Sequence, residues 1–261
     1  MNAPDFYLTF RPLTAHPYDR EDCRELAPGA PLRPLVRCYW GPRAVKPRLV
    51  VPDGCVDVIL TVEDGRVRAR FCPLDKHPYR VPGGVKEMLG VRFYFWALAY
   101  ACGEREAALD AWAASLERAG YCTADFNQRV ALVDASLSAK LPELKASAAL
   151  LNAMDRLLVT HGRATVSDLA AESVVSARTL ERQFHRTLEI SPKALAEVVR
   201  YQALWRWRLA APRFDVQDAV AALGYVDQAH LLNDFRRMHG LPLEEAVRQA
   251  RMDVAFLQDK P

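Results

Sequence analysis

A pattern of two helices joined by a tight turn occurs twice in the C-terminal part of the chain. The first copy begins at Thr165 and the second at Val216. In each copy, apolar residues recur at helical spacing and a small polar residue, Ser176 or Asp227, precedes the second helix as a predicted N-cap. The pattern predicts two helix-turn-helix units in an all-helical region.

The second helix of each unit has an apolar face and a polar face. Leu180 and Phe184 in the first unit, and Leu231 and Phe235 in the second, are four residues apart and are predicted to point inward. Side chains that can contact base edges, by hydrogen bonds or by apolar contact, are then left outside. These candidate DNA contacts are Ala177, Arg178, Glu181 and Arg182 in the first unit, and Gln228, His230 and Asn233 in the second.

Several candidate contacts have ordinary surface alternatives. Glu181 is suited either to accept from a cytosine amino group or to pair with Arg178 across one helical turn. Lys193, Arg236 and Arg237 suit phosphate anchoring, although solvated surface explains them nearly as well. The sequence leaves these alternatives open.

Between the units, Pro192 is predicted to begin a long helix that extends from about Lys193 to Leu209. A rigid helix would hold both units on one face of DNA, where major grooves recur about every 34 Å. From Arg178 to Arg213 there are eight Lys or Arg residues against three Glu residues. This basic stripe contrasts with a nearly balanced whole chain, in which 35 Lys and Arg face 32 Asp and Glu.

The first hundred residues read as short strands broken by Pro and Gly. Asp64-Gly65 is a typical hairpin turn. We therefore expect an α+β protein with an N-terminal, cupin-like β-barrel or sandwich. Strands are predicted at Tyr7–Phe10, Leu35–Trp40, Leu49–Val51, Val56–Val62 and Val67–Phe71.

Helical spacing replaces the strand pattern from Glu104 onward, with predicted helices from Glu104 to Gly120, Thr123 to Ala139 and Pro142 to Gly162. This change predicts three regions. Residues 1–103 form a sensor domain, 104–144 a helical linker or dimerisation region, and 145–261 a DNA-binding domain.

The chain carries no secretory signal, no apolar run long enough for a bilayer, and no catalytic or cofactor-binding motif that we recognise. We expect a cytoplasmic protein that is not an enzyme and has no cofactor or metal. Its six cysteines lack metal-ligand spacing and are expected to be free thiols. A cysteine-based sensor or enzyme using Cys55 or Cys72 is a less favoured alternative.

The paired units resemble the AraC/XylS family of bacterial transcription regulators. The resemblance covers roughly Ala149 to Arg251 and implies binding to double-stranded promoter DNA, contact with RNA polymerase and, with the N-terminal part, a small-molecule effector or a homodimer. It is carried by Leu169-Ala170, Ser176, Leu180, Arg182, Phe184, Ser191-Pro192, Gly224-Tyr225, Asp227, His230, Phe235 and Gly240.

The N-terminal signature Val51-Pro52-Asp53-Gly54-Cys55-Val56-Asp57 resembles a domain of unknown ligand that begins some family members. The candidate ligand-binding residues are Asp53, Cys55, Asp57, Tyr94 and Trp96. Turn capping by Asp53 and an ordinary strand core around the aromatic residues are the simpler explanations.

The chain departs from the family pattern at Glu189, where glycine is usual, at Ala219-Val220, at Leu231, and at Pro242, which comes one residue early. These departures motivate a second hypothesis, in which degenerate helix-turn-helix units bind a protein instead of DNA.

Overall fold

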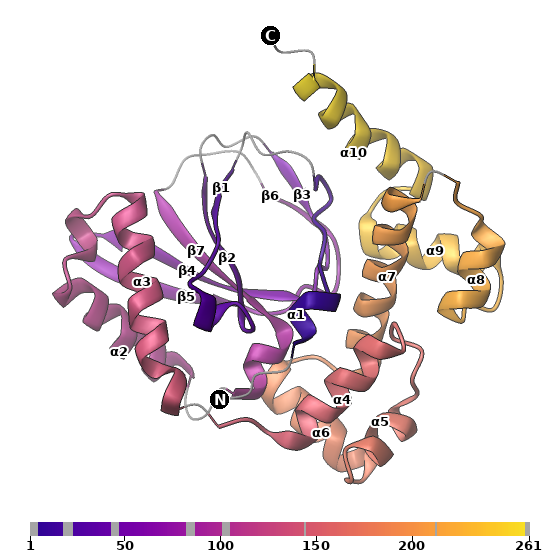
Figure 1. The fold of residues 1–261 in the computed structure, drawn as a ribbon, viewed down its shortest axis with the longest axis horizontal. Coiled ribbons are helices and arrows are strands. Elements are labelled where there is room, and N and C mark those ends of the chain that lie inside the picture. Colours follow the sequence, from indigo (N-terminus) through magenta and orange to yellow (C-terminus); the bar gives the residue numbers. More distant parts are fainter. Residues whose placement is uncertain are drawn as a thin grey trace.

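The computed structural model describes residues 5–17, 23–42, 47–81, 87–100, 105–143, 145–211 and 213–258. A β-rich part with two covering helices is followed by a helical part (Figure 1). The α+β class predicted from the sequence is confirmed.

The β-rich part contains two antiparallel sheets. The larger has the strand order β1-β2-β7-β4-β5, and β3 pairs with β6 in the smaller. The sheets face each other across an internal cavity, so the expected barrel is a half-open one (Figure 1). The strands are β1 (Cys23–Leu26), β2 (Val36–Pro42), β3 (Arg48–Val50), β4 (Cys55–Glu63), β5 (Arg66–Cys72), β6 (Tyr79–Val81) and β7 (Met88–Tyr94).

The predicted hairpin joins β4 to β5. Asp64 and Gly65 both adopt positive φ, 50° and 73°, as a tight two-residue turn requires. The hairpin sets Asp57 opposite Cys72, while on the other side of β4 the same Asp57 lies opposite Arg92 of β7. This register brings an aspartate and an arginine together inside the sheet.

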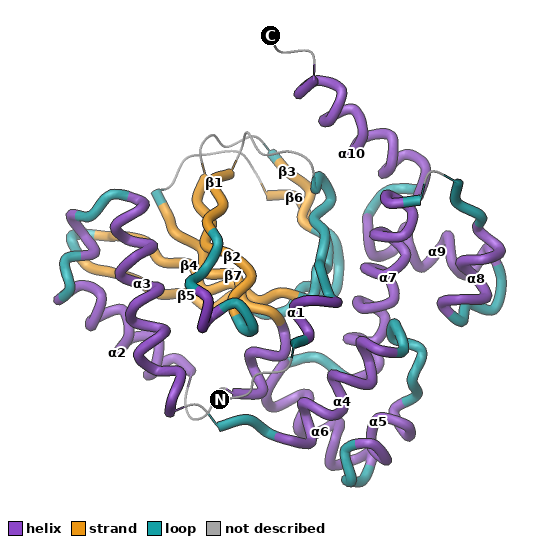
Figure 2. The backbone as a smooth tube through the Cα atoms, viewed as in Figure 1, coloured by secondary structure: helices purple, strands orange, loops and turns teal. Residues whose placement is uncertain are grey.

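Helices α2 (Arg105–Arg118) and α3 (Phe126–Lys140) cover the outer face of the larger sheet, away from the helical part (Figure 2). Trp112 and Leu116 of α2 and Val130 and Val133 of α3 are buried in one core with sheet residues such as Val91. The apolar faces of both helices are therefore used within the chain.

The structure corrects several element predictions. The expected strand Tyr7–Phe10 is a helical turn, α1 (Phe6–Thr9), because Phe6 and Phe10 then reach the same side and pack edge-on against Trp96. Strands β1 and β6 were not predicted. The helix expected from Pro142 instead begins after Ser147, whose hydroxyl accepts from Leu150 N.

The helical part places one helix-turn-helix unit toward each end of α7 (Figure 1). Apart from α7 (Pro192–Ala210), its elements are α4 (Ala148–Val159), the first unit α5 (Val166–Glu172) and α6 (Ala177–Leu188), the second unit α8 (Val216–Leu223) and α9 (Gln228–His239), and α10 (Leu243–Gln258).

The two parts share a core. A 3-10 helix at Phe95–Tyr100 follows β7, and its Phe95 and Trp96 are fully buried in the same cluster as Met154 of α4 and Phe184 of α6. The β-rich part is thus packed directly against the first helix-turn-helix unit. None of the helices described is long and apolar enough to span a membrane.

Candidate functional site

The first candidate recognition helix, α6, matches its predicted layout. Ser176 caps it by accepting from Thr179 N at 3.1 Å, and Leu180 and Phe184 are fully buried. The opposite face is exposed, because the buried residues fix the rotation of the helix. The exposed residues include Ala177, Arg178, Glu181 and Arg182.

The second candidate recognition helix, α9, is built in the same way. Gly224 ends α8 with φ 68°, and the Asp227 carboxylate accepts from His230 N at 2.7 Å. Leu231 and Phe235 are fully buried. Gln228, His230 and Asn233 are exposed.

The basic stripe divides into two groups. Arg200 donates to Gly162 O at 2.7 Å, Arg206 to Thr9 O at 2.8 Å, and Arg208 pairs bidentately with Glu244. These arginines of α7 stabilise the chain itself. Those of α6, Arg178 and Arg182, are exposed and have no hydrogen bond or ion pair within the described part of the chain.

The three predicted phosphate anchors also differ. Lys193 and Arg236 are exposed on α7 and α9. Arg237 is engaged, because it pairs with Glu197 at 3.1 Å and with Asp234. Burial alone would lower the pKa of Arg237, but these two carboxylates together raise it. The structure thus favours Lys193 and Arg236 over Arg237 as free cations.

The departures from the family pattern do not break the units. Glu189 adopts the left-handed conformation, φ 59°, that glycine adopts easily. Leu231 fills its core position. Pro242 O accepts from Ala246 N at 2.9 Å in the first turn of α10.

A cavity of about 420 Å³ lies between the two β-sheets. Its volume is in the range of small-molecule sites. Three of the predicted ligand residues, Asp53, Cys55 and Asp57, line it. The structure therefore brings this part of the N-terminal signature to one concave site.

Arg92 organises the cavity floor. Its Nε and Nη2 donate to the two Asp57 oxygens at 3.0 and 2.8 Å, and its Nη1 lies 3.3 Å from Asp53 Oδ2. Trp40 Nε1 also donates to Asp57, at 3.0 Å. Burial alone would lower the pKa of Arg92, but the charges of Asp57 and Asp53 together raise it. This fixed ion-pair network was not predicted, although an arginine within an apolar strand was a signal for one.

Tyr94 and Trp96 do not line the cavity. They stack on each other with ring centroids 4.3 Å apart, within the core that joins β7 to α4 and α6. Trp96 Nε1 donates to Pro34 O at 2.7 Å, so its polar group is satisfied there. Both residues therefore belong to the packed core, as the simpler interpretation of the sequence predicted, and not to a ligand site.

The cysteines near the cavity are at least partly buried. Burial, assisted by the charge of Asp53, raises the pKa of Cys55 well above its usual value, and burial also raises that of Cys72. A thiolate is the reactive form, so a raised pKa disfavours reaction at both thiols. Cys38, Cys55, Cys72 and Cys122 are free, and Cys102 lies outside the described residues.

Gln202 of α7, which was not predicted from the sequence, connects the cavity wall to the helical part. Its side chain accepts from Leu13 N at 2.8 Å and donates to Leu13 O at 3.0 Å and Pro52 O at 2.8 Å. Beside it, Trp205 Nε1 donates to Thr14 O at 3.1 Å. Thr14 lines the cavity itself, and so does Asp53, the residue that follows Pro52 in the chain.

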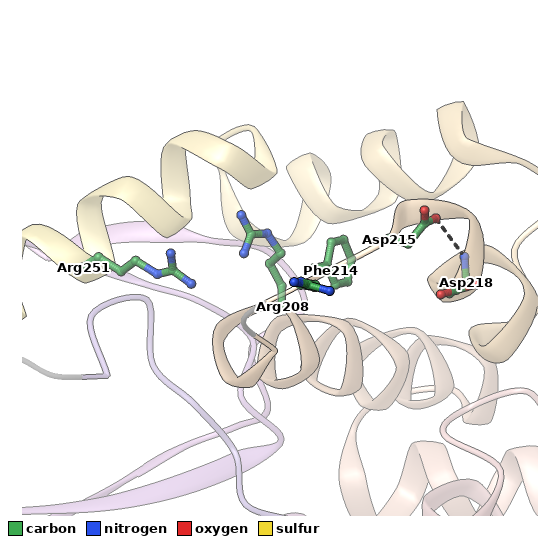
Figure 3. Close-up of a pocket in the computed structure, with 6 residues that line it drawn as sticks. Arg208, Phe214, Asp215, Asp218 and Arg251 are labelled. Atoms are coloured by element: carbon green, nitrogen blue, oxygen red, sulfur yellow. Dashed lines mark hydrogen bonds between the residues drawn. The ribbon is translucent and has the colours of Figure 1, made fainter.

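A second, open hollow of about 570 Å³ lies where α7 ends and α8 begins (Figure 3). Arg208 and Arg251 approach it from α7 and α10. The Arg208 guanidinium lies over Phe214, 5.4 Å from the ring centroid, and Asp215 accepts from Asp218 N as the N-cap of α8. These contacts show that the hollow lies at the capped N-terminus of α8, where the second unit begins.

Two family models match parts of this chain. The family described as "Helix-turn-helix domain" matches residues 169–249, and "Domain of unknown function (DUF6597)" matches residues 24–110. No curated protein matches the chain significantly.

Solved structures give weaker similarity. A probable AraC family transcriptional regulator from Rhodopseudomonas palustris CGA009 is 27% identical over 39% of this chain and 96% of its own, with a TM-score of 0.35. An apo ToxT variant from Vibrio cholerae strain SCE256 is 9% identical over 88% and 94%, also at 0.35. Unsaturated fatty acid bound wild-type ToxT from the same strain is 8% identical over 78% and 91%, at 0.34. TM-scores this low do not establish a shared overall arrangement.

Two capped helix-turn-helix units on one linker helix, the residues of the family pattern and the matched domain point to the same family. The chain thus contains a helix-turn-helix domain over residues 169–249, and in this region it resembles the AraC/XylS family of DNA-binding transcription regulators.

Proposed function

We propose that the protein binds promoter DNA through the exposed faces of α6 and α9, and that a small molecule in the cavity between the β-sheets modulates this binding. The DNA contacts rest on the free Arg178 and Arg182 of α6 and on the exposed amide and imidazole groups of α9. Such side chains read base edges in the major groove.

One observation carries the proposed modulation: Gln202 joins the wall of the cavity to the helix that carries both units. Buried amide hydrogen bonds are costly to break without replacement. A ligand that displaces Pro52 or Thr14 would therefore disturb the position of α7. An effector acts only through a difference in affinity between two such arrangements.

DNA binding is tested by selecting sequences from random duplex DNA with the full chain. We expect an enriched site and affinity that falls steeply with salt. Failure to enrich any sequence at low salt, together with capture of a specific protein partner, would instead support the hypothesis of a protein-interaction module.

The coupling is tested with Gln202→Met, which removes the hydrogen bonds but keeps the side-chain length. We expect the affinity for the selected DNA to change about fivefold or more, the usual lower range for coupled sites. Gln249→Leu is the control, because within the described part of the chain Gln249 bonds to Glu245 on its own helix. Equal affinity in wild type and Gln202→Met, with the fold intact, would contradict the coupling.

Homodimer formation and contact with RNA polymerase are further parts of the proposal. The apolar faces of α2 and α3 lie against the sheet, so a dimer would use their outer, polar faces. Sedimentation with and without DNA tests the dimer.

A further inference from the structure

The charges around the cavity are unequally matched. Four carboxylates and three arginines line it, and Arg92 alone is shared by Asp53 and Asp57. Arg48 lies over the Trp40 ring, 5.5 Å from its centroid, and Arg70 is exposed. Asp53 and Asp57 share the Arg92 guanidinium, and Glu25 lies 3.8 Å from Arg37, which leaves Asp75 as the lining carboxylate to explain.

Asp75 faces the same cavity from the loop between β5 and β6. It is partly buried and forms no ion pair with any residue that the structure describes. Burial and the negative charges of Asp53 and Asp57 raise the pKa of Asp75 to about 6, against a smaller lowering by Arg92 and a hydrogen bond from Tyr79. Among the described residues, this carboxylate therefore has no ion-pair partner.

The surroundings of Asp75 suit the organic part of a cation. Tyr79 lines the cavity and remains 48% exposed, an unusual state for a large aromatic side chain. Aromatic faces attract ammonium and guanidinium groups. Ile59, Met88 and Val81 add apolar side chains to the wall of the same cavity.

We propose that the cavity binds a small organic cation, a primary amine or guanidino compound, whose charge pairs with Asp75 beside Tyr79 and whose apolar body packs against Ile59 and Met88. This inference rests on the proposed effector function and names the class of effector. An anion of the same shape is disfavoured, because Arg92 is already paired with two carboxylates and Asp75 would repel the anion.

The test uses three probes of nearly equal shape: phenethylamine, phenylacetate and 2-phenylethanol. Each is titrated into the full chain by calorimetry and by thermal unfolding. We expect phenethylamine to bind and to raise the Tm, while the anion and the alcohol bind at least about tenfold more weakly, a difference of about 1.4 kcal/mol. Preference for phenylacetate, or no binding of phenethylamine at about 10 mM, would overturn the proposal.

Two variants locate the site. Asp75→Asn removes the charge at constant size and is expected to weaken phenethylamine binding about tenfold. Asp110→Asn is the control, because Asp110 is an exposed acid on α2, outside the cavity. Undiminished binding in Asp75→Asn would overturn the assignment of Asp75.

The ligand class and the coupling can fail separately. DNA affinity is measured with and without phenethylamine. Binding of phenethylamine that depends on Asp75 but leaves DNA affinity unchanged would support the cation site and contradict the proposed modulation. A change of DNA affinity that is lost in Asp75→Asn would support both.

Discussion

Arg105, the first residue of α2, forms an ion pair with Glu189, the left-handed residue that ends α6. Arg105 Nη2 also donates to Thr187 O at 3.1 Å, and its guanidinium lies 4.0 Å from the centroid of the Phe71 ring. A position where the family usually carries glycine therefore ties the first helix-turn-helix unit to the β-rich part.

This contact predicts different effects for two substitutions. Glu189→Gln removes the charge and keeps the strained backbone, so the free energy of unfolding should fall by about 1 kcal/mol. Glu189→Gly loses the same ion pair but relieves the strain, and should stay within about 0.5 kcal/mol of wild type. Urea denaturation of the full chain measures both. An equal loss in the two variants would contradict a compensating backbone effect.

Base contacts predict a change of specificity. Arg182→Ala and Asn233→Ala should each relax preference at a small number of base positions, by about 1–3 kcal/mol per lost contact. Repeating the DNA selection with each variant gives the comparison. Arg118→Ala, on α2, is the control. A uniform loss of affinity across all sequences would show instead that these side chains contact phosphates.

Gly162 lies in the turn between α4 and α5, where we expect a larger side chain to clash with α7. A Cβ atom there would lie 2.1 Å from Ala196 O, whereas at Gly120, which also has positive φ, it would meet no atom within 4 Å. Gly120→Ala should cost about 1 kcal/mol from backbone strain alone. Gly162→Ala should cost clearly more, about 3 kcal/mol or above. Thermal unfolding compares the pair, and similar losses would refute the close contact.

His239 predicts a loss of stability in acid. Burial, with a smaller effect of His16, lowers the pKa of His239 from 6.5 to about 4, and its Nδ1 lies 2.8 Å from the Tyr201 hydroxyl. Because the unfolded chain then binds the proton first, the free energy of unfolding should decrease as pH falls from 6.5 toward 4, by up to about 3 kcal/mol.

Urea denaturation between pH 7 and pH 4 checks this prediction. His239→Gln, which cannot titrate, should flatten the dependence, and His77→Gln, an exposed control, should leave it unchanged. The same slope in wild type and His239→Gln would assign the acid sensitivity to other groups.

Local signals in the sequence predicted the helix-turn-helix units well. The caps Ser176 and Asp227 and the inward pairs such as Leu180 and Phe184 act within a few residues, so spacing alone specifies them. The Asp64-Gly65 turn was predicted for the same reason.

Features that depend on distant pairing were missed. Strand β1, Cys-Arg-Glu-Leu, has no apolar alternation and is a strand because it pairs with β2. Arg92 meets Asp57 from 35 residues away, and Gln202 meets Leu13 from 189 residues away. Gln202 did carry one signal, a polar residue between the buried Tyr201 and Leu204 of an apolar helix face.

The core shared by Trp96, Met154 and Phe184 has a thermodynamic consequence. Neither part can melt without exposing apolar surface of the other, so heating should give one calorimetric transition instead of two. A compound that stabilises the β-rich part by mass action would then raise the melting temperature of the helix-turn-helix units as well. A ligand bound in the β-rich part would thus change the thermal stability of the whole chain.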